Sequence, residues 1–229
     1  MLRLTGFGLL AVLVFSPVSW ISAGELEPPG GPAPSMRTLQ EIYEKLEELG
    51  ERQEALLHVP VPRTGSTQSV ESGDDGDMQR GVPLPVPRFT DNNDGTVTDN
   101  LTGLVWLRNV ACLAPSGWQA AFIAVDGLKH GGCDLTDGSR ATDWRLPNIR
   151  ELYSLVDHGF SFPALSNAVG TEQFTEGDPF LLPEDLDFFE WWSSTRLPGG
   201  FVAVVYFGSG TISGLVGGNG LLWPVRDAH

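Results

Sequence analysis

The feature that most constrains the fold is a change of pattern at Arg88. The segment just before it, residues 59–87, is rich in proline and glycine, whereas after it short strand-like stretches alternate with signals for tight turns. The first such signal, Asn93-Asp94-Gly95, separates two strand-like runs, and Asp-Gly in that position is a strong indication of a β-hairpin. We therefore expect residues 88–229 to form a domain built on antiparallel strands.

Two predicted helices interrupt these strands. Ser116 with Gln119, and Asn148 with Glu151, have the spacing of a capping box at the start of a helix. The regular alternation of strands and helices that a parallel sheet needs is absent, so the expected fold class is α+β. The remaining strands are expected at residues 101–106, 191–194, 201–207, 211–216 and 221–225.

Residues 1–23 have the pattern of a secretory signal peptide. Arg3 gives a basic start, an apolar run follows, and Ala23 is a small residue at a suitable cleavage point. The alternative, an uncleaved membrane anchor, would need about 20 apolar residues. We therefore predict an exported protein (periplasm, cell surface or extracellular space) without a membrane span after cleavage.

Cys112 and Cys133 are the only two cysteines of the chain. In an oxidising compartment a disulfide between them is the expected state, and a loop of this size contributes about 3 kcal/mol in the chain-entropy description. The alternative is a metal-binding or redox-active pair. It has weaker support, because the spacing is not Cys-x-x-Cys and only His130 lies close by.

The formal net charge is −15, from 14 basic and 29 acidic residues. A basic surface for nucleic acid or anionic lipid is therefore not expected, and we predict no nucleic-acid partner. With 41% hydrophobic residues the chain can still bury a substantial core. The tryptophans beside the predicted strands are expected mostly in that core, although one or two could face a ligand. These tryptophans are Trp106, Trp144, Trp191, Trp192 and Trp223.

Residues 36–58 form an amphipathic segment after a flexible lead at residues 24–35. From Leu39 to Leu56 the apolar positions, with Gln53 among them, are separated by three and four residues in turn, which is typical of a coiled-coil seam. Fewer than three heptads are present, and an isolated helix of this length is marginal in water. We expect copies of the chain to associate through it as a trimer or dimer; the alternative is packing on the chain's own domain.

Two acidic segments raise the question of calcium, the one cofactor considered for this chain. Residues 59–87 are interpreted as a linker rich in proline, glycine and aspartate, and residues 73–77 within it are either a calcium loop or solvated linker. Asp91 and Asp94 are candidate metal ligands at the first hairpin. A plain hairpin turn is favoured there, because Gly95 comes one place too early for an EF-hand loop.

No motif of nucleophilic, phosphate-binding or zinc-dependent catalysis is found in the sequence. Paired carboxylates can hydrolyse glycosides, but an acidic run in a loop is usually a solvated surface. We therefore assign no catalytic residue and treat an exported hydrolase as the least favoured function. The acidic run in question contains Glu184, Asp185, Asp187 and Glu190.

Four motifs follow one another along the chain, namely Arg88–Trp106, Asp143–Leu152, Trp192–Thr195 and Trp223–Arg226. Together they resemble the Lcl C-terminal domain family. The resemblance spans about residues 88–226 and implies a C-type-lectin-like fold in exported, surface or adhesive proteins, in which the last strands and loops often carry ligand binding. Some relatives bind sulfated glycosaminoglycans, but this acidic chain lacks an evident basic cluster, and the sugar motifs of calcium-dependent lectins are absent.

The sequence thus favours a secreted or cell-surface module that binds an extracellular glycan or protein ligand and is not catalytic. An envelope structural protein that only contacts other proteins is the alternative. Candidate contact residues are chosen because they fall in loops or on the polar phase of the predicted C-terminal strands. They are Arg196, Tyr206, Ser213 and Asn219.

Overall fold

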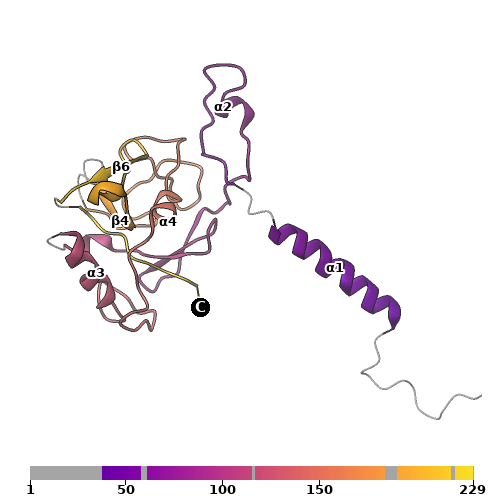
Figure 1. The fold of residues 1–229 in the computed structure, drawn as a ribbon, viewed down its shortest axis with the longest axis horizontal. Coiled ribbons are helices and arrows are strands. Elements are labelled where there is room, and N and C mark those ends of the chain that lie inside the picture. The colour runs from indigo at the N-terminus through magenta and orange to yellow at the C-terminus, as the bar shows by residue number, and fades with distance from the viewer. Residues whose placement is uncertain (1–37, 58–60, 115–116, 184–189, 218–219, 229) are drawn as a thin grey trace, which may run out of the picture. The chain divides into compact units, whose positions relative to one another are not determined.

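The computed structural model describes residues 38–57, 61–114, 117–183, 190–217 and 220–228 (Figure 1). The chain divides into two compact units, residues 1–58 and residues 59–229. No helix in these described ranges combines the length and the apolar character needed to cross a bilayer. The helices are α1 (Leu39–Leu57), α2 (Asp75–Met78), α3 (Trp118–Asp126) and α4 (Ile149–Tyr153). The strands are β1 (Phe89–Asp91), β2 (Thr96–Asp99), β3 (Val105–Leu107), β4 (Glu190–Arg196), β5 (Val202–Tyr206), β6 (Thr211–Leu215) and β7 (Val225–Arg226).

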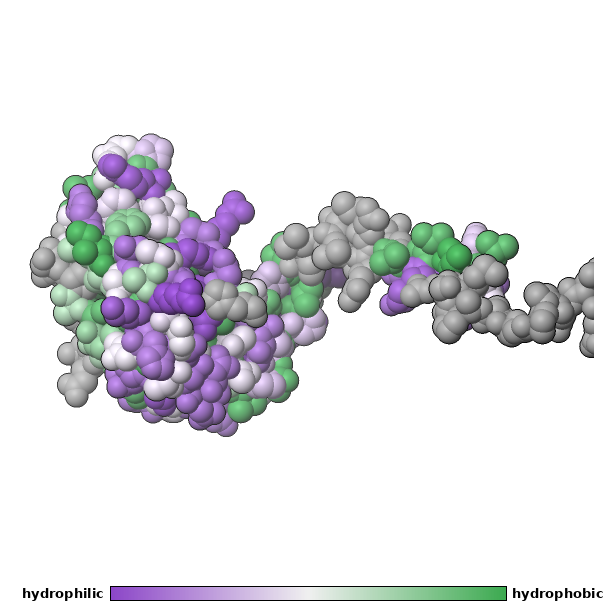
Figure 2. Space-filling view, turned by 90° about the horizontal axis from the view of Figure 1, so that it is seen from below, coloured by the Kyte–Doolittle hydropathy of each residue, from purple (hydrophilic) through white to green (hydrophobic). Residues whose placement is uncertain are grey.

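In the first unit, α1 starts with a capping box that the sequence analysis did not identify. The Thr38 hydroxyl accepts the Glu41 amide, and the Glu41 carboxylate accepts the Thr38 amide. The apolar stripe of α1 is uncovered: Leu39 is 86% exposed, Leu46 61% and Leu49 50% (Figure 2). The seam residues beyond Leu49 lie outside the described side chains.

The first sheet of the second unit has the strand order β1-β2-β3-β7, with every pair antiparallel. Its first connection is the predicted hairpin, in which Asn93 and Gly95 both adopt positive φ. A Cβ at Gly95 would also come within 2.5 Å of the Asp134 carbonyl oxygen, so this turn position requires glycine. The hairpin prediction is confirmed.

The predicted strand at residues 101–106 starts later than expected, at Val105. Residues 101–104 instead form a turn around the Asp99 carboxylate, which accepts the Leu101 amide and the Thr102 hydroxyl. A side chain that binds backbone amides in this way stabilises a turn at the expense of a strand. The strand predicted at residues 221–225 is also shorter than expected: β7 begins at Val225, and Leu221 makes a single bridge to Trp191.

The second sheet has the order β4-β5-β6 and is also antiparallel. It meets the first sheet around a core of aromatic side chains, in which Trp223 contacts Trp106, Trp191, Phe180 and Phe207. The five tryptophans expected in the core are each at most 2% exposed. Two antiparallel sheets with few helices make the second unit an α+β domain, as the sequence predicts.

The two domain helices follow the prediction unequally. Asn148 and Glu151 form the predicted capping box of α4. By contrast, α3 begins at Trp118 with Gly117 as its N-cap and no side-chain cap, so the expected cap at Ser116, which lies outside the described residues, does not start this helix. Cys112 and Cys133 are joined by a disulfide whose Cα atoms are 5.6 Å apart, which confirms the predicted bond.

Residues 61–82 form an ordered loop, here called the leader loop, that belongs to the second unit (Figure 1). A short parallel bridge between Pro62 and Val82 closes its base. The Thr64 carbonyl oxygen accepts the amide of His158, which attaches the loop to the domain. Composition suggested a plain linker over residues 59–87; the compact fold of this loop was not foreseen.

Candidate functional site

A cleft of about 450 Å³ opens between the start of α3 and the ends of β4 and β6. Its polar side chains are Gln119 and Arg196, both exposed, and its aromatic wall is the half-buried Trp118. The guanidinium carbon of Arg196 lies 5.9 Å from the centre of a Trp118 ring. The cleft therefore presents a cation, an amide and an indole ring, three groups that bind polar ligands with apolar faces.

The local sequence explains how these groups come together. The Trp118 indole N–H donates to the Ser193 carbonyl oxygen at 2.8 Å, which ties the first residue of α3 to β4. Three residues later in β4, Arg196 lies opposite Val202 of β5, another residue of the cleft wall. The rest of the wall is Gly117, Gly200, Val216 and Gly217, so little side-chain bulk obstructs the opening.

Of the three predicted contact residues that the structure describes, only Arg196 lines this cleft. Ser213 lies opposite Val204, and Tyr206 opposite Thr211. Val202, Val204 and Tyr206 are every second residue of β5, so their side chains lie on one face of the sheet. Arg196 lies opposite the first of them and Ser213 opposite the second, so Arg196, Ser213 and Tyr206 share that face in three successive rows. Asn219 lies outside the described residues.

The carboxylates of the candidate calcium ligands Asp91 and Asp94 are engaged by protein groups. Asp91 accepts the Asn93 amide and pairs with the Arg108 guanidinium at 3.0 Å. Asp94 accepts both the amide and the hydroxyl of Thr96. In the described parts of the chain, no group of three or more histidine, cysteine or acidic side chains is placed to hold a metal ion.

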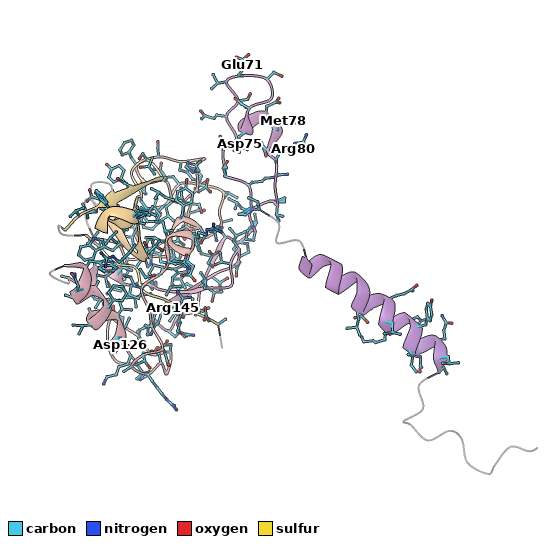
Figure 3. The ribbon with its side chains drawn as sticks, viewed as in Figure 1. Glu71, Asp75, Met78, Arg80, Asp126 and Arg145 are labelled. Carbon is cyan, nitrogen blue, oxygen red and sulfur yellow. A yellow bond between two sulfur atoms is a disulfide. The ribbon has the colours of Figure 1, made fainter. Side chains whose placement is uncertain are left out.

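The acidic residues 73–77 organise the leader loop (Figure 3). Asp74 is the N-cap of α2, and the backbone amides of Glu71, Val70 and Asp77 hold the pKa of its carboxyl at about 2. The Asp77 carboxylate accepts the Gly73 amide, and the Thr64 hydroxyl donates to Asp75. The solvated-linker interpretation therefore misses a local structural role of these carboxylates.

The acidic run considered for hydrolysis is described only in part. Residues 184–189 lie outside the description, and Glu190 is the first residue of β4, where it lies opposite Tyr206. Among the acidic groups of the described residues, Asp157 is the one whose pKa is clearly raised from its usual value, because its carboxyl is buried. Trp118 and Asp157 were not identified as site residues from the sequence, because nothing in their local spacing distinguishes them from core residues. Gln119 was considered only as a helix-capping residue.

Comparison with known protein families bears on most of the second unit. The model of the Lcl C-terminal domain family matches residues 95–226, which is more than half of the chain. The chain belongs to the Lcl C-terminal domain family. The match starts within the first hairpin, after β1, and ends in β7. This Lcl C-terminal domain therefore includes the strands from β2 to β7, α3, α4 and the cleft at Arg196. No curated protein and no solved structure matches the chain.

Proposed function

We propose that this protein is an exported, non-catalytic binding module whose Lcl C-terminal domain holds an extracellular glycan at the cleft between Trp118 and Arg196. The observation that carries the proposal is the pairing of an exposed guanidinium with an indole ring in a cleft of about 450 Å³. Aromatic rings pack against the apolar faces of sugars, while guanidinium and amide groups bind their oxygen atoms. Export rests on the signal-peptide pattern of residues 1–23.

The C-type-lectin-like fold belongs to the same proposal. Its support is the family membership together with an α+β domain that contains two antiparallel sheets, the helices α3 and α4, and a disulfide. In this fold the C-terminal strands and their loops carry the ligand, and the cleft at Arg196 lies at the ends of β4 and β6.

We also propose that α1 joins copies of the chain. Its apolar stripe occupies two positions in seven and is exposed, which suits a narrow helix–helix seam better than the broad face of a globular core. Linking several binding domains raises the avidity for a repetitive ligand without any new contact. Several copies of a weak site, held in one assembly, would thus bind such a ligand firmly enough for an adhesive function.

A binding screen tests the proposed function. The purified protein is applied to an array of glycans and to an array of extracellular proteins, in calcium and again in EDTA because of Asp91 and Asp94. We expect reproducible glycan signals that compete with free glycan. An array on which only proteins bind would replace the glycan with the alternative below.

The second candidate, an envelope protein that contacts other proteins, is favoured by β6. This strand lies at the edge of its sheet, and Ile212 within it is 49% exposed. No charged residue occurs between Leu197 and Val225, although exposed edge strands are commonly protected by charges. An uncharged open edge suits pairing with a strand of another protein.

A further inference from the structure

A second cleft, of about 410 Å³, lies between the leader loop and the domain. The leader loop contributes Arg63, Ser66 and Thr67, and the domain contributes Asp157 and Thr171. The apolar part of the wall includes Phe160, Pro83 and Leu84. A cleft of this volume is large enough for a small organic ligand. It shares no residue with the cleft at Arg196.

Asp157 is the unusual group of this cleft, because it carries an ionisable carboxyl and yet only 5% of the residue is exposed. Oδ1 accepts the Gly159 amide at 2.8 Å, and within the described residues no cationic side chain forms an ion pair with this carboxylate. Burial raises the pKa of Asp157, against the effects of the Gly159 amide and of the charges on Arg88 and His158. A buried carboxylate without a direct counter-ion is costly, so its position in a cleft is typical of a functional group.

The leader loop is fitted closely around this carboxylate. A Cβ added to Gly65, which has φ +90°, would lie 1.9 Å from Asp157 Oδ1. A Cβ added to Gly159 would lie 2.7 Å from the Gly65 carbonyl oxygen. The segments at Gly65 and Gly159 therefore approach each other with no side chain between them. The leader loop in this way forms one wall of the cleft that contains Asp157.

Charge decides which kind of ligand fits. Arg88, whose charge acts on Asp157, is already paired with Asp99. The Arg63 guanidinium in the cleft wall donates to the Gln79 side chain and to the Gly81 carbonyl oxygen. The whole chain carries −15, so its field attracts cations and repels anions. Hydroxyl groups of Ser66, Thr67 and Thr171 add neutral acceptors around the carboxylate.

We propose that the cleft between the leader loop and the domain binds a small organic cation, an ammonium or guanidinium group whose charge is neutralised by the Asp157 carboxylate. The cation is either a free small amine or the side chain of a lysine or arginine on another protein. Both supply the charge and the hydrogen-bond donors that the buried carboxylate lacks.

Titration with paired probes, followed by the NMR amide shifts of Gly65 and Gly159, tests this proposal. Glucosamine is compared with neutral N-acetylglucosamine, and a short peptide with one lysine is compared with the same peptide acetylated on that lysine. We expect at least one amine to bind with a Kd of about 1 mM or tighter, and its acetylated form at least about tenfold more weakly. Preference for glucosamine indicates a free amine as the natural ligand, and preference for the peptide indicates a protein side chain.

Variants separate the site from general electrostatics. Asp157→Asn keeps an acceptor for the Gly159 amide and should weaken amine binding at least about tenfold. Thr171→Arg, at an exposed position of the cleft wall, should also weaken it by placing a cation there. The matched control Glu172→Gln removes an exposed carboxylate outside the cleft and should leave the Kd within about twofold. Neutral probes that bind as well as amines, equal affinity of Asp157→Asn, or unshifted Gly65 and Gly159 amides would each overturn the proposal.

Discussion

The Arg88 guanidinium is paired with the Asp99 carboxylate at a position where both side chains are almost completely buried, 3% and 0% exposed. The second nitrogen of the guanidinium donates to the Ser154 carbonyl oxygen beyond α4, and Asp99 holds the turn at residues 101–104. Burial lowers the pKa of Arg88 to about 10, so the group remains charged at neutral pH. One ion pair therefore connects the first sheet, its turn and the end of α4.

Arg88→Met should destabilise the domain by about 3–5 kcal/mol, because the substitution leaves the buried Asp99 without its partner. Urea unfolding measures the change in the free energy of unfolding. Arg140→Met, at an exposed position, is the matched control and should stay within about 0.5 kcal/mol. A cost for Arg88→Met as small as that of the control would contradict this account of the ion pair.

Asp157 should destabilise the folded protein at neutral pH. Because its pKa is raised above 3.8 on folding, the folded state holds this proton more tightly than the unfolded state. Its contribution to the free energy of unfolding is therefore fully present below pH 3.8 and is lost as the pH rises through the folded-state pKa. Asp157→Asn should gain stability relative to wild type over that rise in pH, as followed by urea unfolding at several pH values. If Asp157→Asn instead lost stability relative to wild type as the pH rises, this account of Asp157 would be ruled out.

The leader loop should loosen in strong acid. The pKa of Asp74 is about 2 rather than 3.8, because backbone amides bind its ionised form. The stabilisation that it gives is present above pH 3.8 and is lost as the pH falls through about 2. Carbon NMR of the Asp74 carboxyl, titrated from neutral pH downward, should give a midpoint near 2. A midpoint at the ordinary value of 3.8 would show that the cap does not persist in solution.

Replacing Leu46 and Leu49 with serine should convert the assembled protein to monomers without unfolding the second unit. The reason is that both leucines belong to the apolar seam of α1 and are exposed in the single chain. Light scattering over a range of concentrations measures the association, which should be weak because fewer than three heptads are present. Glu44→Ser with Glu47→Ser, outside the seam, is the control and should not change it. A wild-type protein that stays monomeric at every concentration would exclude the seam.

Local signals in the sequence predicted part of this fold correctly. Asp94-Gly95 marks the first hairpin, Asn148 with Glu151 starts α4, and Cys112 and Cys133 form the disulfide. The hairpin and the start of α4 each depend on residues that are close in the sequence. The disulfide depends on the single pair of cysteines in the chain. Such features can be predicted because the physical cause and its effect lie in the same segment.

Features that depend on tertiary contacts were not predicted. The turn at residues 101–104 forms because Asp99 is held by Arg88, and the leader loop is ordered because Thr64 and Gly65 contact the segment at Asp157. In the candidate site, Arg196 was identified from its position in the C-terminal strands. Trp118 was not identified as a site residue, because its position beside Arg196 depends on the hydrogen bond to Ser193 across 75 residues of sequence.

The most direct test of the central claim, that the domain binds its ligand at the cleft of Trp118 and Arg196, compares variants on the strongest glycan found in the screen. Calorimetry gives the Kd of wild type, Gln119→Ala, Arg196→Gln and the control Arg150→Gln, which removes an exposed guanidinium from α4. The account predicts that the two cleft variants each weaken binding about tenfold, which is about 1.4 kcal/mol, and that the control leaves it unchanged. Equal affinities for all four proteins would contradict it.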